Sequence, residues 1–187
     1  MDWPADLAPA ALQQPDRVSC GAASVVAARV LLDGWRPEDA TAAIREEHRR
    51  LTSARSPRER FQLPWPRRLG TPPWAVANAL RSLTGEPVAT VHARPRPVLA
   101  YDVLVEQVRT RPVGVYVGNR WLPRHVVLAI GVVAGPEEPR GEPSRADAGG
   151  AVRLFDPARG ALVTVPRDRW HRHRVGVAGW SHLWFVV

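Results

Sequence analysis

The chain has 187 residues, a formal net charge of +8 and a hydrophobic fraction of 45%, which together fit one globular domain with a core of ordinary size. Its single cysteine excludes an intrachain disulfide and a cysteine-rich zinc site. No run approaches the roughly 18 consecutive apolar residues of a membrane span, and the acidic start Met-Asp-Trp-Pro-Ala-Asp does not resemble a secretory signal. We therefore expect one soluble, cytoplasmic domain over residues 1–187 with no membrane partner.

The positive charge comes entirely from arginine, because the sequence contains no lysine. A strongly basic chain can bind nucleic acids or acidic surfaces. Here the arginines are scattered and do not interleave with aromatic residues in a recognisable motif. Alanine, proline, glycine and valine are abundant as well, a pattern typical of GC-rich coding sequence. We interpret the charge as a bias of composition and expect no nucleic-acid partner, and we keep nucleic-acid binding as the weakest alternative.

The first half of the chain reads as helices. Residues 20–33 are apolar nearly all round and precede Gly34, a natural C-cap, so they predict a buried central helix. Residues 37–51 predict a second, exposed helix with Pro37 at its start. Residues 52–73 are rich in proline and arginine and predict a long loop, and residues 73–85 predict a third helix that ends at a glycine.

The second half reads mainly as strands. Short β-branched runs between Gly or Pro residues predict strands at 88–92, 113–117, 125–133, 151–156, 161–166 and 180–187, with one more helix at 101–110. Residues 134–150 have few apolar side chains and predict a flexible hairpin insertion. Helices followed by strands indicate an α+β domain in which an antiparallel sheet forms the C-terminal part.

Cys20 is the strongest candidate for chemistry, because it begins the predicted central helix and has a histidine and a carboxylate elsewhere in the chain. A helix N-terminus and a neighbouring imidazolium lower a cysteine pKa from about 8.5 into the range of roughly 3.5–7.5. His125 begins one predicted strand and Asp156 ends the next. A histidine so placed can form the thiolate–imidazolium pair, and Asp156 can orient the ring. The alternatives are an inert core cysteine, a polar strand-edge histidine and an aspartate that only opens a turn.

Three further residues are candidates for binding substrate. Gln14, six residues before Cys20, can offer its amide to an oxyanion beside the Cys20 N–H, although its neighbour Gln13 is an alternative. Gly21 has no side chain and so leaves room for a substrate carbonyl. Trp121, four residues before His125, is a candidate for lining a substrate groove, and the alternative is that it fills space beneath a loop.

The remaining histidines do not predict a metal site. His171 and His173 have no acidic or cysteine partner at ligand spacing, so we expect a solvated basic loop there. His182 lies between two tryptophans and is expected on a strand face in the core or at its rim. We expect neither a metal nor any other cofactor.

The segment Gln14-x5-Cys20-Gly21 resembles the signature of papain-like cysteine peptidases, and especially the bacteriocin-processing, double-glycine-leader peptidase group. Three further strings are similar to that group: Gly70-Thr-Pro-Pro-Trp-Ala-Val-Ala-Asn-Ala-Leu, His125-Val-Val-Leu-Ala-Ile-Gly and Phe155-Asp-Pro157. The resemblance implies a papain-like fold, thiol-dependent hydrolysis of an amide bond, and catalytic roles for Gln14, Cys20, His125 and Asp156. The long 134–150 segment and the absence of an attached transporter domain depart from the group, so its leader-peptide substrate does not carry over.

The sequence therefore predicts a cysteine peptidase that acts on a peptide or protein through a Cys-His-Asp triad and a thioester intermediate. Acyl transfer or deamidation on the same fold shares the first half-reaction and stays open. A catalytically silent papain-like module that binds a peptide or a protein is the alternative from another class. Substrate identity and oligomeric state are not predicted.

Overall fold

The computed structural model describes residues 1–58, 60–133 and 150–187. Within them it has five α-helices and one antiparallel sheet of six strands, which makes the chain an α+β protein. The helices are α1 (Cys20–Asp33), α2 (Ala40–Leu51), α3 (Pro73–Thr84), α4 (Pro97–Val108) and α5 (Arg167–His171), with short 3-10 turns η1 (Pro9–Leu12) and η2 (Arg67–Leu69). The strands are β1 (Val91–His92), β2 (Val113–Gly118), β3 (Pro123–Val133), β4 (Ala151–Asp156), β5 (Ala161–Val165) and β6 (His182–Val186).

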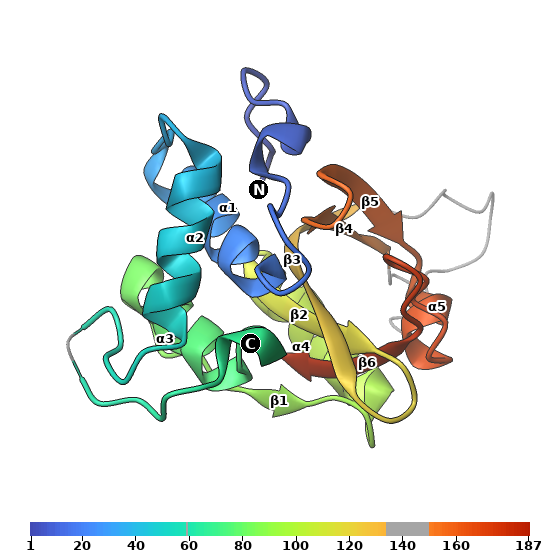
Figure 1. Ribbon diagram of the computed structural model, residues 1–187. Helices are drawn as coiled ribbons and strands as arrows, with labels where there is room; N and C mark the ends of the chain where they lie inside the picture. The colour runs from blue at the N-terminus through green and yellow to red at the C-terminus, as the bar shows by residue number, and fades with distance from the viewer. Residues whose placement is uncertain (59, 134–149) are drawn as a thin grey trace.

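The strands lie in the order β1-β6-β2-β3-β4-β5, so the last strand of the chain inserts between the first and the second. Helices α1, α2 and α3 gather on one face of the sheet, and α4 covers the opposite face (Figure 1). The alternation of side chains along β2 divides the core accordingly. Tyr116 packs with α1 and α3, whereas Val115 and Val117 pack with α4.

Helix α1 is the buried central helix that its composition predicts. Ten of its fourteen residues are buried, and it ends where the Gly34 N–H donates to the Val30 carbonyl at 3.1 Å with Gly34 at φ 66°. That left-handed conformation is the reason for glycine at this C-cap. Helix α3 likewise ends at Gly85, at φ 77°. The predicted bounds of both helices are therefore confirmed.

Two other helices differ from the prediction. Helix α2 begins at Ala40 rather than Pro37, because the Asp39 carboxylate accepts the Ala42 N–H at 2.9 Å and caps the helix there. Helix α4 begins at Pro97 rather than residue 101, since proline is well suited to the first turn of a helix. The short α5 was not predicted. The insertion predicted over residues 134–150 lies outside the described residues except for Gly150.

The predicted strands are present, but β1 is restricted to Val91–His92 instead of residues 88–92. Strand β3 begins at Pro123, two residues before His125. Among the described residues, no helix combines the length and the apolar character needed to cross a membrane.

Candidate active site

Cys20 is the first residue of α1, where a helix concentrates partial positive charge on N–H groups that have no partner within the helix. The turn before it is fixed by Asp16, whose Oδ1 accepts the N–H groups of Val18 and Ser19 at 2.9 Å each. Burial opposes the charge on Asp16, but these hydrogen bonds outweigh it and lower the pKa of the carboxyl group. The negative charge of Asp16 thus stabilises the entry to the helix one turn before the thiol.

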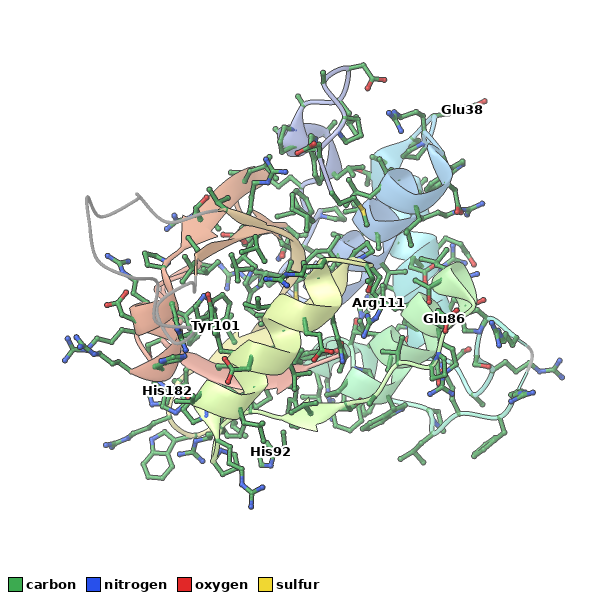
Figure 2. The ribbon with its side chains drawn as sticks, turned by 180° about the vertical axis from the view of Figure 1, so that it is seen from behind. Glu38, Glu86, His92, Tyr101, Arg111 and His182 are labelled. Carbon is green, nitrogen blue, oxygen red and sulfur yellow. The ribbon has the colours of Figure 1, made fainter. Side chains whose placement is uncertain are left out.

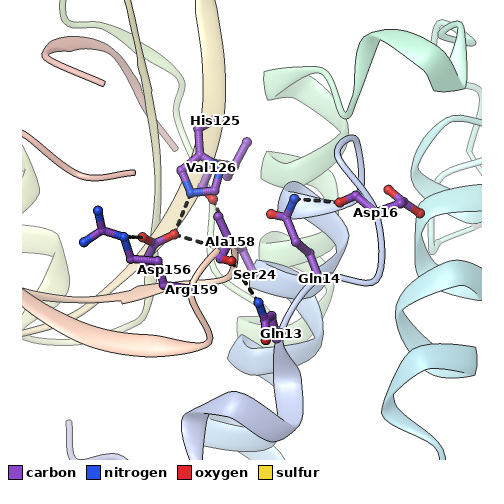
Figure 3. A network of polar contacts seen from close by, with 9 residues as sticks. All are labelled: Gln13, Gln14, Asp16, Ser24, His125, Val126, Asp156, Ala158 and Arg159. Carbon is purple, nitrogen blue, oxygen red and sulfur yellow. Dashed lines mark hydrogen bonds and ion pairs between the residues drawn. The ribbon is translucent and has the colours of Figure 1, made fainter. Parts of the chain in front are cut away.

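Strands β3 and β4 bring His125 and Asp156 together. The distance between His125 Nε2 and Asp156 Oδ1 is 2.8 Å, and both side chains are buried. Oδ1 also accepts the Ala158 N–H at 3.0 Å, while the Arg159 guanidinium lies 3.9 Å from Oδ2 (Figure 3). The carboxylate is therefore fixed from several directions, which is the arrangement required of a group that orients an imidazole.

The other side of the imidazole faces the thiol. The Cys20 side chain acts on the pKa of His125, which places the thiol close to the imidazole, and because Nε2 is bonded to Asp156, Nδ1 is the ring nitrogen left to face the sulfur. Burial disfavours the charged ring, yet the hydrogen bonds and charges of Asp156 and Cys20 outweigh burial and raise the pKa of His125 to about 9. The ring is therefore an imidazolium at neutral pH, between a carboxylate and the thiol.

Close packing of α1 on the sheet sets the position of the thiol. One turn after Cys20, the Ser24 hydroxyl lies 3.5 Å from the carbonyl oxygen of Val126, which follows His125 (Figure 3). Ala22, Ala23 and Ser24 are each fully buried. These small side chains let α1 approach β3 closely. Because they directly follow Cys20, and Val126 directly follows His125, this packing places the thiol beside the imidazole.

Gln14 lies beside the same site, in the turn between η1 and α1. Its N–H donates to the Pro157 carbonyl at 2.9 Å, and its side-chain Nε2 donates to the Asp16 carbonyl at 2.6 Å. An amide nitrogen carries two hydrogens, so one N–H of Gln14 remains for a further acceptor. The side chain of Gln13 points elsewhere, because its Nε2 donates to the Ala158 carbonyl at 3.0 Å (Figure 3).

The structure gives Gly21 a role in packing. A Cβ at this position would lie 2.7 Å from Thr71 Cβ, which is closer than real Cβ atoms approach. The space left by the missing side chain is thus filled by Thr71. The glycine allows the loop before α3 to pack on the start of α1, and its role beside a substrate carbonyl stays a prediction.

Trp121 lies in the tight hairpin between β2 and β3, at the end of β3 that carries His125. Its side chain is 66% exposed, and the Arg120 guanidinium lies over its ring at 4.5 Å. Trp121 therefore does not fill space beneath a loop. It stands on the surface near the candidate site, beside the exposed Leu122.

Access to the thiol is narrow, because Cys20 and His125 are each only 5% exposed. Two hollows of the surface, of about 460 and 630 Å³, lie elsewhere. The first is lined by residues of the N-terminal segment, and the second by the ends of α1 and α3 together with the turn after α4. The structure brings the candidate triad together with both the thiol and the imidazole largely buried.

Two residues of the site were not predicted, Asp16 and Tyr116. Asp16 caps the turn before Cys20, and the only sequence signal for it is an aspartate shortly before a helix. Tyr116 is buried, and its hydroxyl donates to the Thr71 carbonyl at 2.9 Å. Burial and the charge of Cys20 raise the pKa of Tyr116, which places this phenol near the thiol. Tyr116 lies within a run of apolar strand residues, so the sequence pattern did not indicate that its side chain lies near the thiol.

Three other histidines pack against aromatic rings. His173 and His182 stack on each other at 4.8 Å, and His171 packs edge-on against Tyr101. Among the described residues, no group of three or more His, Cys, Asp or Glu side chains is arranged to hold a metal ion.

Comparison of the chain with protein-family models, with curated proteins and with solved structures gives no match in any of the three. The arrangement around Cys20 is therefore interpreted from its own geometry.

Proposed function

We propose that this chain is a cysteine-dependent amide hydrolase of the papain-like type, with Cys20 as nucleophile and His125 as general acid and base. The observation that carries the proposal is the buried His125 imidazole, which bonds to Asp156 at 2.8 Å through Nε2 and whose pKa is raised by Asp156 and by the thiol at the N-terminus of α1. A nucleophile, a base in contact with it and a third group that orients the base constitute the triad of covalent catalysis.

In the proposed reaction, the Cys20 sulfur attacks the carbonyl carbon of a peptide or related amide, and His125 transfers its proton to the leaving nitrogen as the C–N bond breaks. Water then attacks the thioester and gives a proton to His125, so that the acid is released and the thiolate–imidazolium pair returns. The Cys20 N–H and the free N–H of Gln14 are the donors for the oxyanion in both steps. An amine in place of water gives acyl transfer, and a glutamine side chain as substrate gives deamidation.

A second candidate function is a catalytically silent module that binds a peptide or protein. The low exposure of Cys20, at 5%, favours this candidate. It predicts a thiol that does not react, whereas the hydrolase proposal predicts a reactive thiol that depends on His125.

The deciding experiment is the rate of Cys20 alkylation by iodoacetamide at pH 6–9, in the wild type and in His125→Ala. The hydrolase proposal predicts rapid alkylation at pH 6 that falls strongly in the variant. Incubation of wild type and Cys20→Ala with a peptide library, followed by product masses, then identifies the reaction, because hydrolysis adds one water across the cleaved bond. A thiol equally slow in both proteins, with no Cys20-dependent product, would reject the hydrolase in favour of the binding module.

A further inference from the structure

Four basic side chains from separate segments gather at one place on the surface. Arg94 follows β1, Arg120 lies in the β2–β3 hairpin, His173 follows α5, and His182 begins β6. The rings of His173 and His182 are stacked at 4.8 Å with an angle of 15° between their planes. Burial, followed by the charges of His173, Arg94 and Arg120, lowers the pKa of His182. These four residues are called the cationic cluster below.

The two arginines of the cluster are held by tryptophans instead of carboxylates. The Arg94 guanidinium lies over the Trp184 ring at 4.7 Å, and that of Arg120 over the Trp121 ring at 4.5 Å. Within the described residues, neither arginine forms an ion pair. A guanidinium stacked on a ring keeps the N–H donors at its edge free for another acceptor. The two arginines therefore carry the positive charge of the cluster without a counter-ion among the described residues.

The sheet places this cluster close to the candidate active site. His182 is the register partner of Gly118, and Gly118 in turn pairs with Pro123, two residues before His125. One residue along, His125 pairs with Val117 and Val117 pairs with Leu183. Because neighbouring strands lie about 4.8 Å apart, the backbone of His182 is about 10 Å from that of His125. Two hydrogen bonds fix the arrangement, from the Ser181 N–H to the Gly118 carbonyl and from Trp184 Nε1 to the Asn119 carbonyl. In Figure 2, His182 lies at the edge of the molecule, near the first residues of α4.

We propose that the cationic cluster binds a carboxylate side chain of the peptide that reacts at Cys20, and so selects acidic substrates. This inference rests on the proposed function. An extended peptide advances about 3.3 Å per residue, so about 10 Å corresponds to an Asp or Glu about three residues from the scissile bond. Carboxylate geometry matches the donor fork of arginine, and the two guanidinium groups supply two such forks.

A peptide carboxylate fits this surface better than a nucleic acid does. Proteins that bind single strands stack bases on open aromatic rings. Here Trp184 is buried, and the rings of Trp184 and Trp121 each already carry an arginine. The exposed Trp121 and Leu122 beside the cluster instead offer apolar contacts to the side chains of a peptide.

The test uses the full chain as Cys20→Ala, with fluorescein-labelled hexaglutamate as probe and fluorescence anisotropy as readout. We expect hexaglutamate to bind in a salt-dependent manner and hexaglutamine to bind at least about tenfold more weakly. Arg94→Gln with Arg120→Gln should weaken hexaglutamate binding about tenfold or more. Arg45→Gln with Arg109→Gln removes the same charge from exposed positions on α2 and at the end of α4, and should change binding less than about twofold.

Equal weakening in the two double variants, or tighter binding of a thymidine hexanucleotide than of hexaglutamate at the same arginines, would overturn the inference. Peptide-library cleavage separates it from the proposed function. A wild type that cleaves acidic and neutral peptides alike overturns the role of the cluster and leaves the hydrolase intact. A preference for acidic residues that disappears in the Arg94/Arg120 variant, while neutral peptides are still cleaved at the wild-type rate, supports it. An unreactive Cys20 in a protein that binds hexaglutamate at the cluster rejects the hydrolase, and with it the selection of substrates, but leaves the cluster as a site for acidic peptides.

Discussion

The N–H of Gln14 donates to the carbonyl oxygen of Pro157 at 2.9 Å, so the proposed oxyanion donor is attached to the residue that follows the orienting carboxylate. The same two segments also meet at Gly160, where a Cβ would lie 2.7 Å from Ala10 Cα. The turn after Asp156 therefore holds both the carboxylate and the segment that carries Gln14. The segment before α1 and the turn after β4 are far apart in the sequence, and their contact fixes Gln14 relative to Asp156. The proposed reaction requires such fixed positions of its groups.

The position of Gln14, fixed by this hydrogen bond, predicts how its substitution changes catalysis. Gln14→Ala removes the proposed second oxyanion donor and should lower kcat by roughly 10²–10³-fold with a much smaller change in KM, because the donor acts mainly in the transition state. The measurement is steady-state kinetics on a cleaved library peptide. Gln13→Ala is the matched control, since the Gln13 side chain donates to the Ala158 carbonyl, and its kcat should stay within a few-fold of wild type. A larger loss in Gln13→Ala than in Gln14→Ala would assign the donor role to Gln13.

The raised pKa of His125 predicts a dependence of stability on pH. The ordinary value of 6.5 rises to about 9 in the folded chain, so the folded state binds the proton more tightly than the unfolded state does. The resulting stabilisation is fully present below about pH 6.5 and is lost as the pH rises through about 9. Its size is on the order of 3 kcal/mol, at about 1.4 kcal/mol per pKa unit.

Urea unfolding between pH 6 and pH 10 measures this contribution. The free energy of unfolding of the wild type should fall over that interval, and the fall should be largely absent from His125→Gln. Parallel curves for the two proteins would show that His125 is not held as an imidazolium. The alkaline limb of hydrolysis should have its midpoint near the same pH, because a neutral ring cannot protonate the leaving nitrogen.

Much of the fold followed from local signals in the sequence. Helices α1 and α3 end at Gly34 and Gly85, which adopt the left-handed conformation that a C-cap requires, so their ends were predictable. The start of α2 was not, because capping by Asp39 competed with the proline signal at Pro37. The position of β6 between β1 and β2 depends on pairings between distant segments, on which local patterns carry no information.

Part of the candidate site was likewise predictable from the sequence, and part of it was not. The order of Cys20, His125 and Asp156 and their positions at element ends predicted that they meet, and the structure brings them together. The packing of Thr71 against Gly21 was not predicted, because Thr71 lies fifty residues further along the chain. The cationic cluster was missed for a similar reason, since its four members come from separate segments and only the sheet register assembles them.

The role of Asp156 predicts a graded response to two substitutions. Asp156→Ala removes both the charge and the acceptor for His125, and should lower kcat/KM by roughly 10²–10⁴-fold. Asp156→Asn keeps an acceptor for the ring and for the Ala158 N–H, and should retain clearly more activity than the alanine variant. Both variants should shift the alkaline limb of the pH profile downward, because the charge that raises the His125 pKa is gone. Equal activity in Asn and Ala variants would mean that orientation of the ring is unimportant.

The contact between Gly21 and Thr71 predicts a coupling that stability measurements detect. Gly21→Ala forces its Cβ to within 2.7 Å of Thr71 Cβ and should destabilise the fold by about 1–3 kcal/mol, as overpacking of a tight core does. Thr71→Gly removes the clashing atoms, so the double variant should be more stable than the sum of the single effects predicts. Urea unfolding of the four proteins gives the coupling directly. Strict additivity would show that Gly21 is required for some reason other than the approach of Thr71, such as its predicted role beside the substrate.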